Sequence, residues 1–145
     1  MSMATGWYNI AKERLAKDTL NFTTDTIKII LIGTGYTFDP DHQFVSAVVS
    51  NEINATNYTR KTATLTITRQ DPNDRAVIIV AQPTYTNIGG TTDSTIAGAI
   101  LFKDTGSDST SPLIACLDLS PSTITTNGSS ITLTFDQTNG NLRLS

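Results

Sequence analysis

Three side chains that could bind a metal ion lie close together in the sequence, at Asp39, Asp41 and His42. Carboxylates and imidazole suit divalent ions, and His42 is the one histidine of the chain. No second cluster supplies the ligands that would complete a coordination sphere, and Pro40 between the two aspartates is typical of a turn. We therefore interpret these residues as a turn and expect no bound metal ion.

The other candidates for chemistry are equally isolated. The single cysteine, Cys116, lies within the apolar run Leu113–Leu117, which favours an inert core thiol. The loop Asp104–Asp108 alternates oxygen-bearing side chains around a glycine, but it lacks the spacing and the final glutamate of a calcium-binding loop, so an ordinary hairpin loop is favoured. Gly33–Gly35 follows a strand pattern without the third glycine of a dinucleotide-binding fingerprint.

Nucleophilic catalysis needs a serine or cysteine together with a base and an orienting acid, and no motif in this sequence brings them together. We therefore expect no catalytic residues, no cofactor and no enzymatic activity. A small glycosidase is the remaining enzyme alternative, and it would require two carboxylates about 5–10 Å apart in a cleft.

The length and composition indicate one mainly β domain. The chain has 145 residues, a net charge of -3 and 16% charged residues. It is rich in Thr and Ile, whose branched Cβ atoms fit a pleated sheet, and poor in the Glu and Lys typical of helix surfaces. The absence of a basic excess argues against nucleic-acid binding. The chain also lacks the run of about 18 apolar residues that would indicate a membrane span.

The most apolar stretch is Thr26–Ile32, in which five of the seven residues are Ile or Leu. Such a short β-branched run predicts a strand that is buried on both faces inside a sheet. The loop Gly33–Gln43 follows it. After this loop, Phe44–Val49 fits either a short helix or a strand, and a short helix with Asp41 as a candidate N-cap is favoured.

The one amphipathic helix is predicted over Thr5–Lys17, because its apolar residues recur at helical spacing from Trp7 to Leu15. A helix this short must dock to be stable. Two alternatives remain open for the segment 1–20. It packs on the sheet of its own domain, or it inserts into a neighbouring subunit.

Period-two alternation and turn signals predict about seven to nine short antiparallel strands. The clearest alternation is in Lys61–Arg69, and Thr95–Lys103 should pair with Leu113–Leu119. Residues 1–145 are therefore interpreted as a single β-sandwich or jelly-roll-like domain with an N-terminal helix. The expected strands are Thr26–Ile32, Lys61–Arg69, Arg75–Ala81, Thr84–Thr86, Thr95–Lys103, Leu113–Leu119, Ser130–Phe135 and Leu142–Leu144.

An ordered set of short motifs covers nearly the whole chain. These motifs are Thr5–Tyr8, Asp25–Ile32, Tyr36–His42, Asn51–Lys61, Leu101–Thr105, Ser111–Ala115, Thr126–Gly128 and Gly140–Leu142. In their order and spacing they resemble a family of small structural proteins from the virions of tailed bacteriophages. This chain departs from the family where a Trp is expected between threonines, since it has Tyr85 there, which keeps an aromatic side chain at this position. No catalytic residues carry over from this resemblance.

The resemblance implies a protein of the virion, assembled in the bacterial cytoplasm with the major capsid protein or other virion proteins as partners. A compact β domain with one docking helix favours a capsid decoration (cement) protein over a neck, tail or fibre component. We expect a homo-oligomer, with a trimer favoured. The candidate interface residues are Met3, Trp7, Tyr8, Tyr36 and Phe38, for which core packing is the alternative interpretation.

A carbohydrate- or receptor-binding β-sandwich on the virion surface is the second functional hypothesis. It requires aromatic side chains on an exposed face or loop rim. Tyr36, Tyr58 and Tyr85 are the candidates for this platform.

Overall fold

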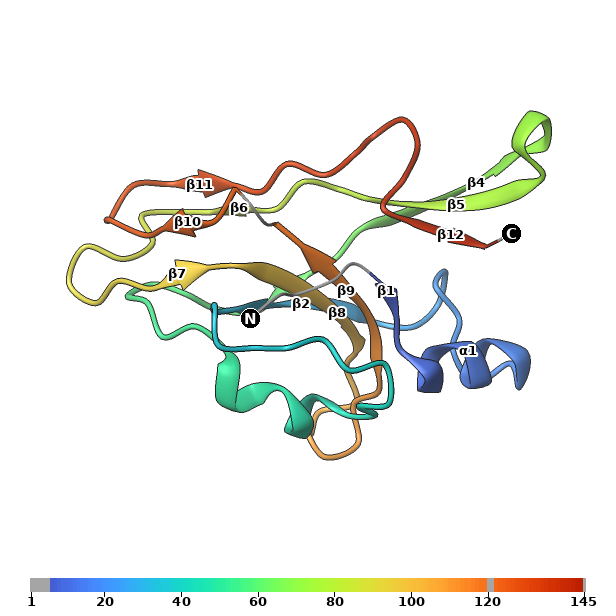
Figure 1. The fold of residues 1–145 in the computed structure, drawn as a ribbon, viewed down its shortest axis with the longest axis horizontal. Coiled ribbons are helices and arrows are strands. Elements are labelled where there is room, and N and C mark those ends of the chain that lie inside the picture. The colour runs from blue at the N-terminus through green and yellow to red at the C-terminus, as the bar shows by residue number, and fades with distance from the viewer. Residues whose placement is uncertain (1–5, 120–121, 145) are drawn as a thin grey trace.

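The computed structural model describes residues 6–119 and 122–144 and confirms a mainly β fold. The strands of this part of the chain form antiparallel sheets, and there is one α-helix, α1 (Figure 1). The elements are β1 (Gly6–Trp7), α1 (Asn9–Ala16), β2 (Ile27–Ile32), the 3-10 turns Val45–Ala47 and Val49–Asn51, β3 (Lys61–Thr62), β4 (Leu65–Gln70), the 3-10 turn Asp71–Asn73, β5 (Arg75–Val80), β6 (Thr84–Tyr85), β7 (Thr95–Ile96), β8 (Gly98–Lys103), β9 (Leu113–Asp118), β10 (Ile124–Thr125), β11 (Ile131–Thr132) and β12 (Leu142–Leu144).

A five-stranded sheet in the order β1-β9-β8-β2-β3 forms the middle of the molecule. Strand β2 pairs with β8 along its whole length, from Ile27 opposite Lys103 to Ile32 opposite Gly98. The predicted antiparallel pairing of β8 with β9 is confirmed, with one irregularity next to Phe102. The predicted interior position of β2 is also correct, since β8 and β3 flank it.

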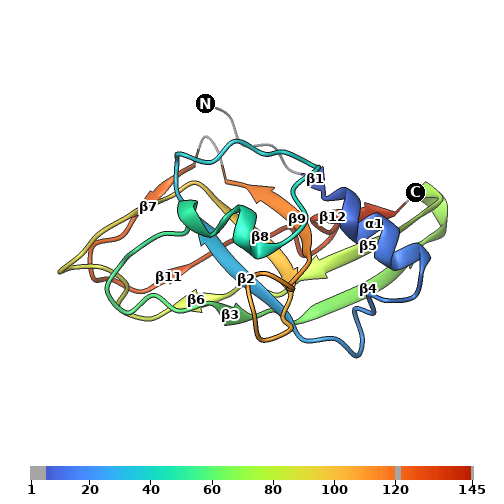
Figure 2. The same ribbon diagram turned by 90° about the horizontal axis from the view of Figure 1, so that it is seen from below.

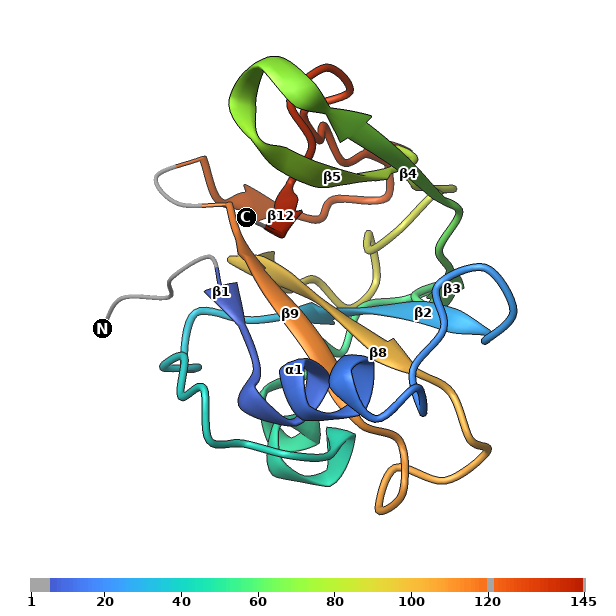
Figure 3. The same cartoon turned by 90° about the vertical axis from the view of Figure 1, so that its right-hand side faces the viewer.

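Three smaller sheets cover one face of the five-stranded sheet. They have the strand orders β12-β5-β4, β11-β6 and β10-β7. The layer of β4, β5 and β12 lies above the layer of β8, β9 and β2 in Figure 3. Between the layers, Ile29 and Leu31 of β2 join one apolar core cluster with Ile78 and Val80 of β5.

The opposite face of the same sheet carries a second core cluster. Because side chains alternate along a strand, Ile30 and Ile32 point away from the first cluster and into this one. Val45 and Val48, both fully buried, cover them from the 3-10 turns. Figure 2 shows these turns lying over the strands. The sheet therefore has an apolar cover on each side.

Helix α1 begins four residues later than predicted, and Trp7 is not part of it. The prediction was wrong because Gly6 and Trp7 pair with Cys116 and Ala115 as strand β1, which satisfies the backbone of β9. Helix α1 then packs against its own chain, with Ile10 and Ala11 buried.

Two further local predictions were wrong. The alternating segment 61–69 is not one strand. Its first residues pair with β2 as β3, and from Leu65 onward it pairs with β5 as β4 in another sheet. Segment 44–49 forms two 3-10 turns instead of one helix, and Phe44 occupies the N-cap position of the first turn without a side-chain cap. The carboxylate of Asp41 instead accepts a hydrogen bond from the Asn9 side chain at 2.7 Å.

Two neighbouring tyrosines give a matched test of this core. The Tyr85 hydroxyl is buried and has no hydrogen-bond partner in the described part of the chain. The Tyr58 hydroxyl accepts from the Leu31 amide at 3.0 Å and donates to Glu52 at 2.8 Å. We predict that Tyr85→Phe leaves the free energy of unfolding unchanged or raises it by up to about 1 kcal/mol, because the substitution removes an unsatisfied polar group.

The control, Tyr58→Phe, should lower the free energy of unfolding by about 1–3 kcal/mol, since it leaves the Leu31 amide without its partner. Urea unfolding monitored by circular dichroism measures both values. Equal losses in the two variants would contradict this assignment of the hydroxyls.

Candidate functional site

The three candidate metal ligands do not converge on one point. His42 Nδ1 lies 3.1 Å from the Tyr36 hydroxyl, and its Nε2 is 3.9 Å from a carboxylate oxygen of Asp39. Asp41 is bound to Asn9 instead. Within residues 6–119 and 122–144, no three His, Cys, Asp or Glu side chains gather as metal ligands. His42 therefore contacts residues of its own loop, whereas Asp41 contacts the first residue of helix α1.

The thiol of Cys116 lies inside the second core cluster, fully buried. Burial raises the pKa of this thiol to about 12, and the charge of Asp118 adds to the shift. Because the thiolate is the nucleophilic form of cysteine, a thiol with this pKa is unreactive at neutral pH. The predicted core role of Cys116 agrees with this environment.

The candidate interface residues have different environments. Tyr8 and Tyr36 lie in the second core cluster, with their hydroxyls 2.9 Å apart, and neither is more than 3% exposed. Burial raises the pKa of both hydroxyls. Phe38 is half-buried, and its ring packs edge-on against Tyr8 at a centroid distance of 5.2 Å. Tyr8 and Tyr36 therefore hold the loop after β2 against its own sheet, as core packing requires.

Trp7 is half-buried, and Met3 lies outside the described residues. The indole Nε1 of Trp7 donates to the carbonyl of Arg143 at 3.2 Å, and its ring lies 6.2 Å from that of Phe22. With Lys12, Arg143 and Leu144, it lines a surface hollow of about 440 Å³. Trp7 thus combines half-burial with a place in the lining of a surface hollow.

The proposed carbohydrate platform is not assembled on the surface. Tyr36 is 3% and Tyr85 2% exposed. Tyr58 is half-buried, with its hydroxyl bonded to Leu31 and Glu52. No exposed face carries the three rings, so this structure offers no stacking surface for a sugar from these residues.

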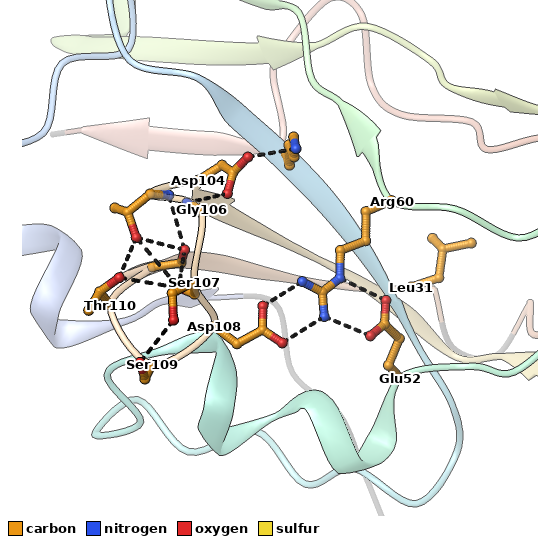
Figure 4. Close-up of polar contacts among 12 residues, drawn as sticks. Leu31, Glu52, Arg60, Asp104, Gly106, Ser107, Asp108, Ser109 and Thr110 are labelled. Carbon is orange, nitrogen blue, oxygen red and sulfur yellow. Dashed lines mark hydrogen bonds and ion pairs between the residues drawn. The ribbon is translucent and has the colours of Figure 1, made fainter.

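The loop between β8 and β9 has the oxygen-rich composition noted in the sequence, but its two carboxylates face cations of the protein. Asp104 lies 2.6 Å from the Lys28 ammonium group and accepts the Gly106 amide at 3.0 Å. Asp108 faces Arg60 (Figure 4). The Lys28 hydrogen bond lowers the pKa of Asp104, and the Arg60 hydrogen bonds lower that of Asp108. The negative charges of this loop are therefore neutralised by Lys28 and Arg60 of the same chain.

A network of four hydrogen bonds centres on Arg60, between Glu52 and Asp108 (Figure 4). Its guanidinium binds both oxygens of Glu52, from Nε at 2.9 Å and from Nη2 at 2.8 Å. It also binds both oxygens of Asp108, from Nη1 at 2.7 Å and from Nη2 at 3.2 Å. We call these three residues the Arg60 clamp.

The clamp joins segments that are distant in sequence. Glu52 pairs with Ile32 at the end of β2, while Asp108 lies in the β8–β9 loop. The guanidinium carbon of Arg60 is 5.6 Å from the ring centre of Phe102, which belongs to the second core cluster. Planar bidentate pairs fix orientation as well as distance. The clamp therefore links these segments at the edge of the second core cluster.

The electrostatics of the clamp favour a permanent charge. The hydrogen bonds that Arg60 donates to Glu52, and then those to Asp108, raise the pKa of Arg60, although its side chain is only 24% exposed. This guanidinium keeps its proton at neutral pH, and four of its five N–H donors bind the two carboxylates. Sequence reasoning missed this cluster because Arg60 and Asp108 are 48 residues apart, and nothing local in either motif indicates the pairing.

Comparisons with protein-family models, with curated proteins and with solved structures find no match to this chain. In the described residues, no helix has the length and apolar character needed to cross a membrane.

Removing the guanidinium should destabilise the fold strongly. We predict that Arg60→Met lowers the free energy of unfolding by about 2–4 kcal/mol, because two partly buried carboxylates lose their partner. The matched control is Arg69→Met, whose ion pair with Asp71 has side chains that are 83% and 69% exposed. This control should lower the free energy of unfolding by less than about 0.5 kcal/mol in the same urea titration. Similar losses in the two variants would show that the clamp contributes no more than a surface ion pair.

Acid should weaken the wild-type fold through the aspartates of this region. The pKa values of Asp104 and Asp108 are lower in the folded chain than the ordinary 3.8, so the unfolded chain takes up these protons first as the pH falls. Their stabilising effect is complete above the unfolded pKa and is lost as the pH falls from about 5 through the folded values. In Arg60→Met the contribution of Asp108 disappears, so stability measured against pH should fall less steeply. Parallel curves for the two proteins would contradict this assignment.

Proposed function

We propose that this chain is a non-enzymatic structural protein of a tailed-bacteriophage virion that decorates the outer capsid. The observation that carries the proposal is that its chemistry-bearing groups are engaged in internal contacts. The Arg60 clamp, the Asp104–Lys28 pair and the buried Cys116 all hold segments of the fold together. This arrangement suits a protein whose task is to remain folded and bind a surface.

The motifs that carry the resemblance to the virion family lie at these same structural positions. Asn51–Lys61 contains both Glu52 and Arg60 of the clamp. Leu101–Thr105 contains Phe102, against which the clamp packs, and Asp104, which binds Lys28. The resemblance therefore rests on residues that maintain the fold, which supports a shared architecture and a structural role.

The hollow around Trp7 is the contact surface that we assign to the capsid. It combines the apolar Trp7 and Leu144, the latter 43% exposed, with the cations of Lys12 and Arg143. Such a surface complements an apolar edge flanked by carboxylates. In this proposal the copies assemble as trimers at local three-fold positions of the shell, where each copy spans a joint between capsid subunits.

Decoration would stabilise the head by adding buried area across these joints. A stable contact needs at least about 1,000 Å² of buried surface, and many copies bound to one shell act together. Pressure from the packaged DNA would then have to break the added contacts before the subunits separate.

The test is binding to purified particles. We predict that the purified chain co-sediments with expanded DNA-free heads of its phage and raises the temperature at which they dissociate. Mass spectrometry of intact virions should find it in hundreds of copies. Failure to bind heads, together with co-purification with tails or a count of six or twelve, would assign it to the neck or tail.

Leu144→Glu tests the contact surface, because it places a negative charge between Trp7 and Arg143. It should weaken co-sedimentation at least about tenfold. The matched control is Val49→Glu, which changes another exposed apolar side chain (37%) away from the hollow. Equal binding by the two variants would contradict the assignment of this surface.

A further inference from the structure

Strand β4 is an unprotected sheet edge. Every other strand longer than three residues is flanked on both sides in the described structure, namely β2, β5, β8 and β9. The other edges are short, and the edge of β12 is partly covered where Trp7 donates to the Arg143 carbonyl. By contrast, β4 (Leu65–Gln70) has six residues, and no described residue hydrogen-bonds its backbone from the side away from β5. Figure 3 shows no ribbon beside this edge.

The strand also carries few of the devices that oppose edge pairing. Proteins protect exposed edges with proline, a bulge or charged side chains, above all lysine, and Arg69 is the one charged residue of β4. Residues Leu65–Gln70 contain no proline or lysine, and the register with β5 runs without a shift from Leu65 opposite Val80 to Gln70 opposite Arg75. A regular, unprotected edge of this length is a template for another strand.

One apolar side chain on this edge remains without cover. Ile67 lies in one cross-strand row with Ile78 and Leu142, on the face that packs against the core. Ile78 is fully buried and Leu142 is 2% exposed, yet Ile67 is 45% exposed. The difference arises because Ile67 has no neighbouring strand on its outer side. A strand paired there would complete the row.

The sequence of β4 is complementary to itself. In an antiparallel pair of two copies centred on Ile67, Ile67 faces Ile67 of the second copy and Thr66 faces its Thr68. Aliphatic and Thr–Thr cross-strand pairs are favourable. Arg69 then lies opposite Leu65, so no like charges meet, whereas a register centred on Arg69 would place two guanidinium groups against each other.

We propose that β4 is a homotypic pairing edge. Two copies of this chain join there antiparallel about Ile67, so that the three-stranded sheets of both copies become one continuous sheet. Such a contact is isologous, with a twofold axis perpendicular to the sheet. It is separate from the hollow around Trp7 and from any threefold contact, and it requires no virion component.

The contact is small, so it should form at high protein concentration. Interfaces below about 1,200 Å² are typically weak, so the range to sample is about 10 μM to 1 mM. We expect sedimentation equilibrium of the purified wild-type chain to show a mass rising from 15.6 kDa toward twice that value. Ile67→Lys should keep the chain at the mass of one copy over the same range, because lysine on an edge strand opposes pairing. Val49→Lys, at another exposed apolar residue, should associate as the wild type does.

A disulfide trap tests the register. Opposed residues of an antiparallel pair have Cα atoms about 4.5–5.5 Å apart, within the range that a disulfide bridges. Ile67→Cys should therefore form a covalent dimer under mild oxidation. In Arg69→Cys the two new thiols would lie about 14 Å apart along the strands, so cross-linking should be at least about tenfold slower. Buried Cys116 is common to both variants.

Three results would overturn the proposal. The first is a mass of one chain at every concentration with no cross-link in Ile67→Cys. The second is association, in any stoichiometry, that Ile67→Lys leaves unchanged. The third is equal cross-linking by the two cysteine variants. Urea unfolding of each variant confirms that it is folded, which the exposure of residues 67 and 69 leads us to expect.

Discussion

The fold depends on a sheet that is apolar on both faces. In β2, Ile29 and Leu31 enter one core cluster while Ile30 and Ile32 enter the other. Each such side chain contributes about 1.5–3 kcal/mol only if its face is covered. The chain must therefore supply two separate covers. The small sheets around β5 provide one, and the segment between β2 and β3 provides the other.

This requirement explains the positions of the aromatic residues. A loop that carries Tyr36 and Phe38 directly after the most apolar strand resembles an exposed binding loop when only the sequence is considered. Once both faces of β2 need cover, the same residues are the nearest large groups that can provide it. Tyr8 contributes from the other end of the chain and meets Tyr36 through their hydroxyls. Two of the five candidate interface residues, Tyr8 and Tyr36, therefore lie in the core, and a sequence pattern does not distinguish the two roles because both favour aromatic side chains.

The predictions that were correct did not depend on partners distant in the sequence, whereas those that depended on such partners were wrong. The apolar run predicts the buried strand β2, and two apolar segments separated by a polar loop predict the pairing of β8 with β9. The alternation across 61–69 is real, but alternation does not reveal that the chain leaves one sheet after β3 and enters another at β4. Likewise, the helical spacing from Trp7 onward holds, yet the open edge of β9 binds Gly6 and Trp7 as a strand. The Arg60 clamp depends on contacts across 48 residues, which no local rule indicates.

Polar groups that already have partners inside the chain differ from the backbone and apolar groups that have none. Arg60 and Lys28 bind carboxylates of the same chain, and Cys116 is fully buried. What the fold leaves incomplete is backbone and apolar surface, at the edge of β4 and around Leu144. Backbone edges and apolar patches bind other protein surfaces, whereas chemistry requires free acids, bases or nucleophiles. The edge of β4 and the surface around Leu144 lie on different strands, so the two contacts proposed for this chain would not compete for the same residues.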